Sequence, residues 1–196
     1  MTVYDLKPRF QALLHPLVSG CANMGISANL VTFAALLLSC VWGYFFLAYP
    51  ADLWVFWSLP IVLFVRMALN AIDGMIAREH NQSSTFGMYF NEIGDIVSDL
   101  ALYVPLLIVM GVSPFVVGQM AFAIILAELC GAFPSFFGGK RHYDGPMGKS
   151  DRAVAFGVIA LLYLVLHTGV WVTLVVLVIT MLTALSAYNR VKKELA

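Results

Sequence analysis

The sequence predicts an all-α integral membrane protein with six transmembrane helices preceded by an interfacial amphipathic helix. Composition, the length of the apolar stretches and the placement of basic residues all favour this class. Of the 196 residues, 61% are hydrophobic and 11% are charged, and the mean hydropathy is +0.89. A soluble domain carries about a quarter charged residues. A surface this apolar is suited to lipid rather than to water.

The six predicted spans are stretches of mostly apolar residues, each close to the roughly 20 residues that a membrane-crossing helix needs. Short segments rich in glycine, proline or polar residues separate them. The spans lie near residues 30–49, 53–78, 84–111, 114–138, 152–168 and 170–190. They leave no room for a separate soluble domain, so we expect one membrane domain over residues 1–196.

The segment before the first span predicts an interfacial helix over residues 3–20. Phe10, Leu13, Leu14 and Leu17 recur at helical spacing, opposite basic and polar residues such as Lys7. This pattern is typical of an amphipathic helix lying on a membrane surface. The alternative is a disordered tail. The segment lacks the apolar core of a cleavable signal peptide.

The basic residues orient the predicted bundle. All lysines and arginines except Arg66 lie before the first span, at the end of the second, between the fourth and fifth, or after the sixth. In a six-span bundle these places are all on one side. Because basic residues favour the cytoplasmic side, we expect both termini to be cytoplasmic. The three cysteines are isolated and predict neither disulfides nor a metal site.

Polar side chains gather in the second and third predicted spans, where ionisable groups are costly and usually functional. They are Asn70, Asp73, Asn91, Glu92, Asp95 and Asp99. The spacings of three and four residues put each set on one helix face, and a short connection makes the two helices antiparallel neighbours. Carboxylate and amide oxygens at one depth suit Mg²⁺ or Mn²⁺.

Small residues border this polar cluster, and Arg78 lies at its edge. Gly74, Ala77 and Gly87 would let a bulky polar ligand approach the backbone, whereas Arg78 is placed to meet an anion. Small residues also occur wherever membrane helices pack closely, so helix packing is the alternative reading.

The same residues resemble the CDP-alcohol phosphatidyltransferase family, whose motif is Asp-x2-Asp-Gly-x2-Ala-Arg-x8-Gly-x3-Asp-x3-Asp. Every spacing matches, and only the first and third aspartates differ, both being asparagine here. The matching positions are Asn70, Asp73, Gly74, Ala77, Arg78, Gly87, Asn91 and Asp95. Residues 26–32 and the loop over residues 145–152 also resemble family segments.

The resemblance implies a membrane enzyme of phospholipid biosynthesis. A CDP-linked lipid, CDP-diacylglycerol, would give its phosphatidyl group to an alcohol and release CMP. By position, Asn70, Asp73, Asn91 and Asp95 would hold one or two Mg²⁺ or Mn²⁺ ions, and Asp95 would be the general base. Asp73, Gly74, Ala77, Arg78 and Gly87 would contact the CDP diphosphate. The resemblance further implies a homodimer in a bacterial inner membrane, with the site on the cytoplasmic side and no nucleic-acid partner.

The two asparagines remove two negative charges from the implied metal site. The site would then hold one ion, or two ions weakly, or would recruit Asp99 or Glu92 as an accessory carboxylate. A homologue that binds nucleotide or lipid without catalysis is an open alternative. A cation transporter fits less well, because the acids lie near one face and no discontinuous paired helices are evident.

The remaining basic residues near the cluster have two readings each. Arg66 is expected to pair with Asp99 or Glu128, either as a structural ion pair or as a brace for the metal site. Lys149, Arg152 and Arg141 belong to a basic loop that either only orients the protein or contacts a phosphate of the acceptor or of lipid headgroups. The identity of the acceptor alcohol does not follow from the motif.

Overall fold

The structure of the chain, a computed structural model, describes residues 3–166 and 169–195. These residues are helical apart from short connections. The helices are α1 Val3–Asn23, α2 Ala28–Ala48, α3 Leu53–Trp57, α4 Leu59–Glu79, α5 Thr85–Val109, α6 Pro114–Phe136, α7 Lys149–Leu166 and α8 Gly169–Glu194.

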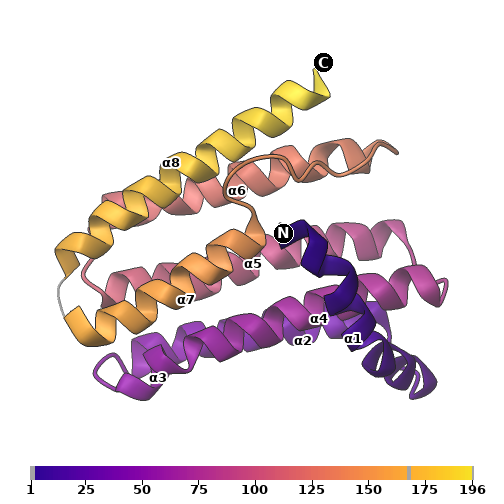
Figure 1. Cartoon of the computed structure of the whole chain (residues 1–196), viewed down its shortest axis with the longest axis horizontal. Helices are drawn as coiled ribbons and strands as arrows, with labels where there is room; N and C mark the ends of the chain where they lie inside the picture. The colour runs from indigo at the N-terminus through magenta and orange to yellow at the C-terminus, as the bar shows by residue number, and fades with distance from the viewer. Residues whose placement is uncertain (1–2, 167–168, 196) are drawn as a thin grey trace.

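The long helices α2, α4, α5, α6, α7 and α8 run along one axis, and α1 lies across one end of them (Figure 1). α5 packs between α2 and α6, while α4 contacts α2 and α7, and α8 lies mainly on α6. Because α4 and α5 both pack against α2, the start of α2, the end of α4 and the start of α5 lie close together on the same side of the bundle.

Within the described residues, four segments are long and apolar enough to span a bilayer: Ala28–Ala48, Leu53–Glu79, Pro114–Phe136 and Val170–Glu194. The other two predicted spans correspond to α5 and α7, and each of these helices holds three charged residues. Most of those charges belong to the candidate site described below. The prediction of six spans is therefore supported by apolar character at four of them and stays a prediction for α5 and α7.

The predicted helix over residues 53–78 is not continuous. A turn at Ser58 divides it into the short α3 and the long α4, although Leu53–Glu79 as a whole is long and apolar enough to span a bilayer. Pro60 is the second residue of α4 and has no N–H to continue the hydrogen bonding of α3. The Ser58 N–H and hydroxyl both bond to the carbonyl of Trp54, which closes α3 at this point.

The fifth predicted span begins earlier than expected. α7 starts at Lys149 rather than at residue 152, because the Gly148 N–H donates to the Asp151 carboxylate at 2.9 Å and caps the first turn. The other end of this predicted span, residues 167–168, lies outside the described residues. The earlier start places Lys149 inside the helix.

A helix is present over the predicted interfacial segment. In α1, Leu14 and Val18 are buried against α2 and α4, whereas Leu13 and Leu17 are 73% and 57% exposed. The side chains of Lys7 and Arg9, which belong to the predicted polar face, lie outside the described residues. The location of α1 at a membrane surface stays a prediction.

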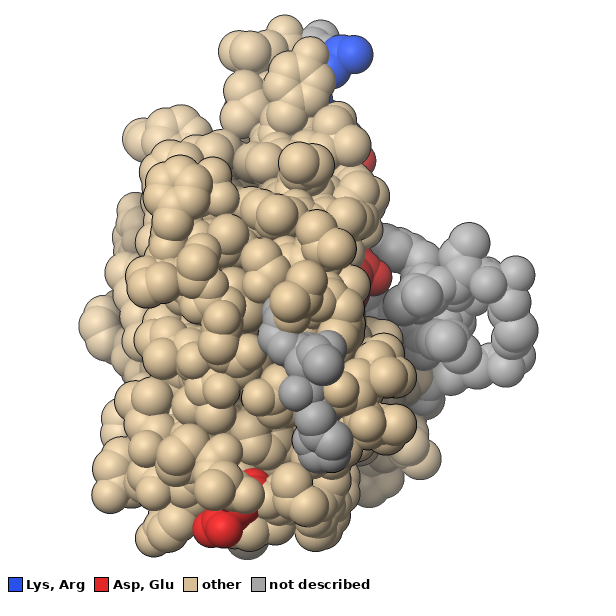
Figure 2. Space-filling model, turned by 90° about the vertical axis from the view of Figure 1, so that its left-hand side faces the viewer, with Lys and Arg blue, Asp and Glu red and all other residues tan. Residues whose placement is uncertain are grey.

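Charged residues are unevenly distributed between the two ends of the bundle. Figure 2 looks at the end that carries the α2–α3 and α5–α6 connections. Most of this surface is uncharged, with acidic groups at the bottom and at the right-hand edge and basic groups only at the upper rim. Arg78, Lys149 and Lys192 belong to helix ends at the opposite side. The structure therefore separates a basic end from an end with few charges.

Gly43 permits the close approach of α2 and α5. A Cβ atom built there would overlap the carbonyl oxygen of Ala101 in α5. We expect Gly43→Ala to push the helices apart and to destabilise the protein by about 1–3 kcal/mol, as overpacking does in other cores. Thermal unfolding of the purified protein in detergent measures this loss.

Gly118→Ala is the matched control for this prediction, because a Cβ atom at Gly118 in α6 has open space around it. Alanine also favours a helix over glycine, so this variant should unfold at or above the wild-type temperature. Equal melting temperatures for Gly43→Ala and Gly118→Ala would contradict the packing argument.

Candidate active site

A pocket of about 220 Å³ opens at the end of the bundle where α2, α4 and α5 meet. Its lining combines hydroxyl, amide, carboxylate and guanidinium groups with small residues. The lining residues are Ala28, Asn29, Thr32, Asp73, Gly74, Ala77, Arg78, Gln82, Ser83, Ser84, Gly87, Met88 and Asn91. Polar and charged side chains therefore gather here, in a molecule whose surface is mostly apolar.

Two oxygen-bearing side chains of the motif line this pocket, one from α4 and one from α5, and both helices pack against α2. Asp73 of α4 is only 3% exposed, and its Oδ2 accepts a hydrogen bond from the Thr32 hydroxyl at 2.7 Å. Asn91 of α5 has a buried Oδ1 with no hydrogen-bond partner. A buried acceptor without a donor is costly, so this amide oxygen is available to a ligand.

Small residues give the pocket its shape. A Cβ atom at Gly74 would lie 3.1 Å from the Arg78 guanidinium, so the glycine makes room for this side chain. A Cβ atom at Gly87 would lie 2.9 Å from Oδ1 of Asn29, which shows how closely α5 approaches α2. Arg78 is exposed at the rim and is the basic residue of the lining.

The connection between α4 and α5 is tied to the start of α2. Oε1 of Gln82 accepts a hydrogen bond from the backbone N–H of Ala28 at 2.8 Å. The hydroxyls of Ser27 and Ser84 cap the first turns of α2 and α5, respectively. These bonds fix three helix ends around the pocket.

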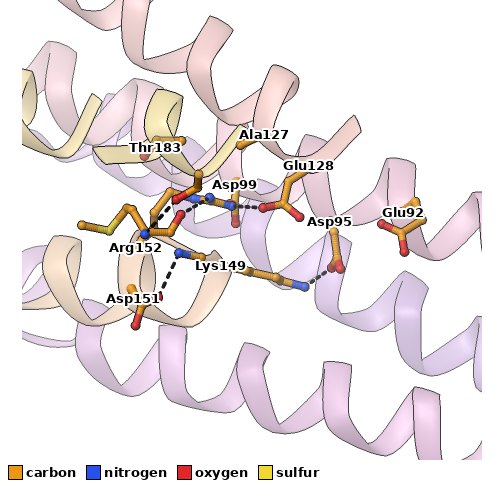
Figure 3. A network of polar contacts seen from close by, with 12 residues as sticks. Glu92, Asp95, Asp99, Ala127, Glu128, Lys149, Asp151, Arg152 and Thr183 are labelled. Atoms are coloured by element: carbon orange, nitrogen blue, oxygen red, sulfur yellow. Dashed lines mark hydrogen bonds and ion pairs between the residues drawn. The ribbon is translucent and has the colours of Figure 1, made fainter. Parts of the chain in front are cut away.

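Asp95 lies one turn beyond Asn91 on α5 and forms an ion pair with Lys149, the first residue of α7. Figure 3 shows the Lys149 side chain extending across to the Asp95 carboxylate. Neither Asp95 nor Asn70 is among the residues that line the pocket. Asp95 nevertheless follows the lining residue Asn91 by one turn of α5, so its ion pair with Lys149 adjoins the pocket.

A network of buried ion pairs lies deeper in the bundle. Asp99 pairs with Arg66 at 2.5 Å and with Arg152 at 2.7 Å, and Arg152 also pairs with Glu128 at 2.7 Å. Arg152 is 0% exposed, and Asp99 and Glu128 are each 1% exposed. Figure 3 shows Arg152 between these two acids. The network joins α4, α5, α6 and α7.

Arg141 extends this network from the connection between α6 and α7. It pairs with Glu128 at 2.6 Å and with Glu92. Burial alone would lower the pKa of Arg141, but Glu92 and Glu128 outweigh this effect and raise the pKa above its usual value. Arg141 therefore stays charged and is held by two protein carboxylates.

The predicted site residues fall into two groups. Six residues of the motif line the pocket together, as their shared role in the motif leads us to expect: Asp73, Gly74, Ala77, Arg78, Gly87 and Asn91. Asp99, Glu92, Arg152 and Arg141 belong to the ion-pair network, where each is engaged by protein charges. Arg66 pairs with Asp99, which is one of the two partners predicted for it, and this prediction is confirmed.

Seven of the lining residues were not among the predicted site residues: Ala28, Asn29, Thr32, Gln82, Ser83, Ser84 and Met88. A polar residue in an otherwise apolar span was the available signal for Thr32. Asn29 and Thr32 also belong to residues 26–32, which resemble a family segment, whereas Gln82 lies in a connection, where polar residues are common, and only the tertiary contacts reveal it.

The residues present fit a divalent cation whose coordination is completed by a ligand. Within residues 3–166 and 169–195, no group of three or more His, Cys, Asp or Glu side chains is arranged to hold a metal ion. Mg²⁺, however, usually keeps several waters and takes one or two carboxylates together with substrate phosphates. Asp73 and the unpartnered oxygen of Asn91 supply such a partial set.

The chain belongs to the CDP-alcohol phosphatidyltransferase family, whose model matches residues 25–185. The match covers α2 to most of α8 and therefore includes the pocket, the Asp95–Lys149 pair and the ion-pair network. Family membership implies the transfer of a phosphatidyl group from a CDP-alcohol.

The chain is similar to two other proteins. It is 48% identical over 158 residues to the inner membrane protein YnbA of Escherichia coli K12, and the aligned region covers 81% of this chain and 78% of YnbA. It is also 33% identical over 94 residues to an uncharacterized protein of Aquifex aeolicus VF5, and this aligned region covers 48% of this chain and 45% of that protein.

Proposed function

We propose that this protein is an enzyme of phospholipid biosynthesis that transfers the phosphatidyl group of CDP-diacylglycerol to an alcohol and releases CMP. The observation that carries the proposal is the shared pocket of Asp73, Arg78 and Asn91, bordered by the glycines of the family motif. It offers both oxygen ligands and a positive charge to a diphosphate. We propose that Gly74, Ala77, Arg78 and Gly87 contact the nucleotide side of the donor.

The candidate ligands for a divalent cation, Mg²⁺ or Mn²⁺, are the side chains at the four motif positions: Asp73, Asn91, Asn70 and Asp95. When bound, such an ion neutralises charge on the diphosphate and on the departing CMP. The ion would take its remaining ligands from water and from the donor's phosphates, which fits the small number of carboxylates in the pocket.

Asp95 would accept the proton of the attacking alcohol. The hydroxyl oxygen forms a bond to the phosphorus of the phosphatidyl group, and the bond from this phosphorus to the bridging oxygen of CMP breaks. CMP leaves with that electron pair, and the hydroxyl proton passes to the carboxylate. The ion pair with Lys149 fixes the direction of the Asp95 carboxylate before the alcohol arrives.

The placement in the membrane follows the same proposal. With α5 and α7 counted as spans, all six long helices cross the bilayer, and the pocket lies at the basic end of the bundle. Because basic residues favour the cytoplasmic side, the pocket, both termini and α1 would face the cytoplasm. The name of the E. coli relative, an inner membrane protein, favours the inner membrane for this chain as well.

Release of CMP tests the proposal. The purified protein is incubated with CDP-diacylglycerol labelled in the cytidine, with Mg²⁺ or Mn²⁺, and with a panel of alcohols that includes glycerol phosphate, serine and inositol phosphate. CMP should appear with at least one alcohol and should fall to background in Asp95→Ala. If no combination of metal and alcohol gives CMP above that variant, the proposed activity is wrong.

A homologue that binds nucleotide or lipid without catalysis is the second candidate. Two observations favour it. Asparagine replaces aspartate at two ligand positions of the motif, and the carboxylate of the proposed base, Asp95, already forms an ion pair with Lys149. Saturable binding of CDP-diacylglycerol with no CMP release in the same assay would select this candidate.

The two asparagines give a prediction about cation affinity. Asn70→Asp and Asn91→Asp each add a negative charge beside Asp73, so we expect each variant to bind Mn²⁺ about tenfold more tightly than the wild type. Titration of the purified protein with Mn²⁺, followed by electron paramagnetic resonance, measures the dissociation constant.

Asn189→Asp is the charge-matched control for this prediction, because Asn189 lies near the end of α8, in a surface pocket with Lys192 and Lys193. Its Mn²⁺ affinity should equal that of the wild type. Unchanged or weaker binding in Asn70→Asp and Asn91→Asp would mean that these amides are not ligands.

A further inference from the structure

We propose that the site binds a single divalent cation, at Asp73 and Asn91, and that the ammonium group of Lys149 takes the place of a second cation beside Asp95. This inference rests on the proposed function, since it specifies how the same site is charged. It accounts for two observations at once: asparagine replaces aspartate at two positions of the motif, and the Asp95–Lys149 ion pair lies next to the pocket.

The charges of the site favour one divalent ion over two. Among the four motif positions only Asp73 and Asp95 are carboxylates, and Asn70 and Asn91 are neutral. One divalent ion and the Lys149 ammonium exceed the charge of the two carboxylates by one, whereas two divalent ions and the ammonium exceed it by three. Unbalanced charge is strongly unfavourable where the surroundings are mostly apolar.

The two motif carboxylates are in different environments. Asp73 accepts a hydrogen bond from Thr32 and faces the pocket, next to the unpartnered amide oxygen of Asn91. Asp95 instead faces Lys149, and their side chains are 9% and 21% exposed, respectively. The structure thus leaves oxygen ligands for a cation at Asp73 and already supplies a positive charge at Asp95.

Lys149 is held in this position by the first turn of α7. The Arg152 N–H bonds to the Gly148 carbonyl at 3.0 Å, and the Gly148 N–H bonds to the Asp151 carboxylate at 2.9 Å. The Arg152 side chain, one turn after Lys149, is anchored to Asp99 and Glu128. The lysine backbone is therefore fixed relative to α5, and its ammonium reaches Asp95 (Figure 3).

The ammonium group would act on the diphosphate as a fixed positive charge. Lysine carries a compact point charge that suits phosphate oxygens. A cation at Asp73 and the ammonium at Asp95 would then lie on two sides of the diphosphate. Lys149 also acts electrostatically on Asp73, so its charge opposes the binding of another cation in the space between the two aspartates.

The test counts Mn²⁺ ions on the purified full chain in detergent, by electron paramagnetic resonance, with no lipid or alcohol present. The wild type should bind one ion per chain. Lys149→Gln removes the ammonium, so it should either bind a second ion or bind the first at least about tenfold more tightly. Tenfold is the effect of one unit charge on a divalent ion about 6 Å away even in water, and it is larger in less polar surroundings.

Two further variants make the count decisive. Lys140→Gln removes an exposed lysine from the connection that leads to α7, and it should match the wild type in number and affinity of ions. Lys149→Arg keeps the charge and should also bind one ion. Melting curves check that every variant is folded.

The inference is overturned if the wild type binds two ions or none, if Lys149→Gln binds Mn²⁺ no differently from the wild type, or if Lys140→Gln shows the same gain. Because the count uses no substrate, it is separate from the proposed activity. A protein that binds one ion but releases no CMP would contradict the transferase and leave this inference standing.

Discussion

Asp73→Asn should reduce CMP release by a factor of at least about 10³. Asp73 is the carboxylate that faces the pocket, so this change would leave three of the four motif positions neutral. A bound cation contributes several kcal/mol to the stabilisation of transition-state charge, and each 1.4 kcal/mol is tenfold in rate. The measurement is the rate of CMP release at saturating donor and alcohol.

The variant is close to isosteric, and its amide oxygen can still accept the hydrogen bond from Thr32. The melting temperature should therefore change little while Mn²⁺ binding is lost. Thr32→Val, which removes the hydrogen bond and keeps the charge, should retain measurable activity. Full activity in Asp73→Asn would show that the pocket is not where the reaction takes place.

Arg152→Ala should destabilise the protein by about 3–5 kcal/mol. Arg152 is fully buried between Asp99 and Glu128, and removal of one partner from a buried ion pair leaves carboxylates without their counter-charge. Arg66 and Arg141 remain beside these acids, so we expect a folded but much weaker protein. The free energy of unfolding in detergent micelles measures the effect.

Lys192→Ala is a suitable control, because this lysine is exposed at the end of α8. It should change the free energy of unfolding by less than about 0.5 kcal/mol, as surface substitutions usually do. Equal losses in the two variants would show that the Arg152 network does not hold α7 against α5 and α6.

The arrangement of the helices followed from the sequence wherever the signal was local. Stretches of apolar residues predicted the long helices to within a few residues, and Ser113 followed by Pro114 marks the start of α6 in both sequence and structure. The break at Ser58 was missed because Pro60 also fits the first turn of a helix. Apolar length alone does not distinguish one helix from two.

The candidate site could be predicted in part. The motif spacing identified Asp73 and Asn91, but their shared pocket arises because α4 and α5 both pack against α2, rather than directly on each other as the short connection suggested. The partners of the charged residues could not be predicted, because Lys149 and Arg152 reach α5 from more than 50 positions away in the sequence. Their placement depends on how α7 packs across the bundle, which no local pattern encodes.

The identity of both products tests the central claim most directly. The purified protein in lipid vesicles is given CDP-diacylglycerol, a divalent cation and one alcohol at a time, and the lipids and nucleotides are analysed by mass spectrometry. Phosphatidyl transfer predicts equal amounts of CMP and of a new phospholipid that contains the alcohol, both absent in Asp73→Asn. CMP formed together with phosphatidic acid and no alcohol-containing lipid, or no CMP with any alcohol, would contradict it.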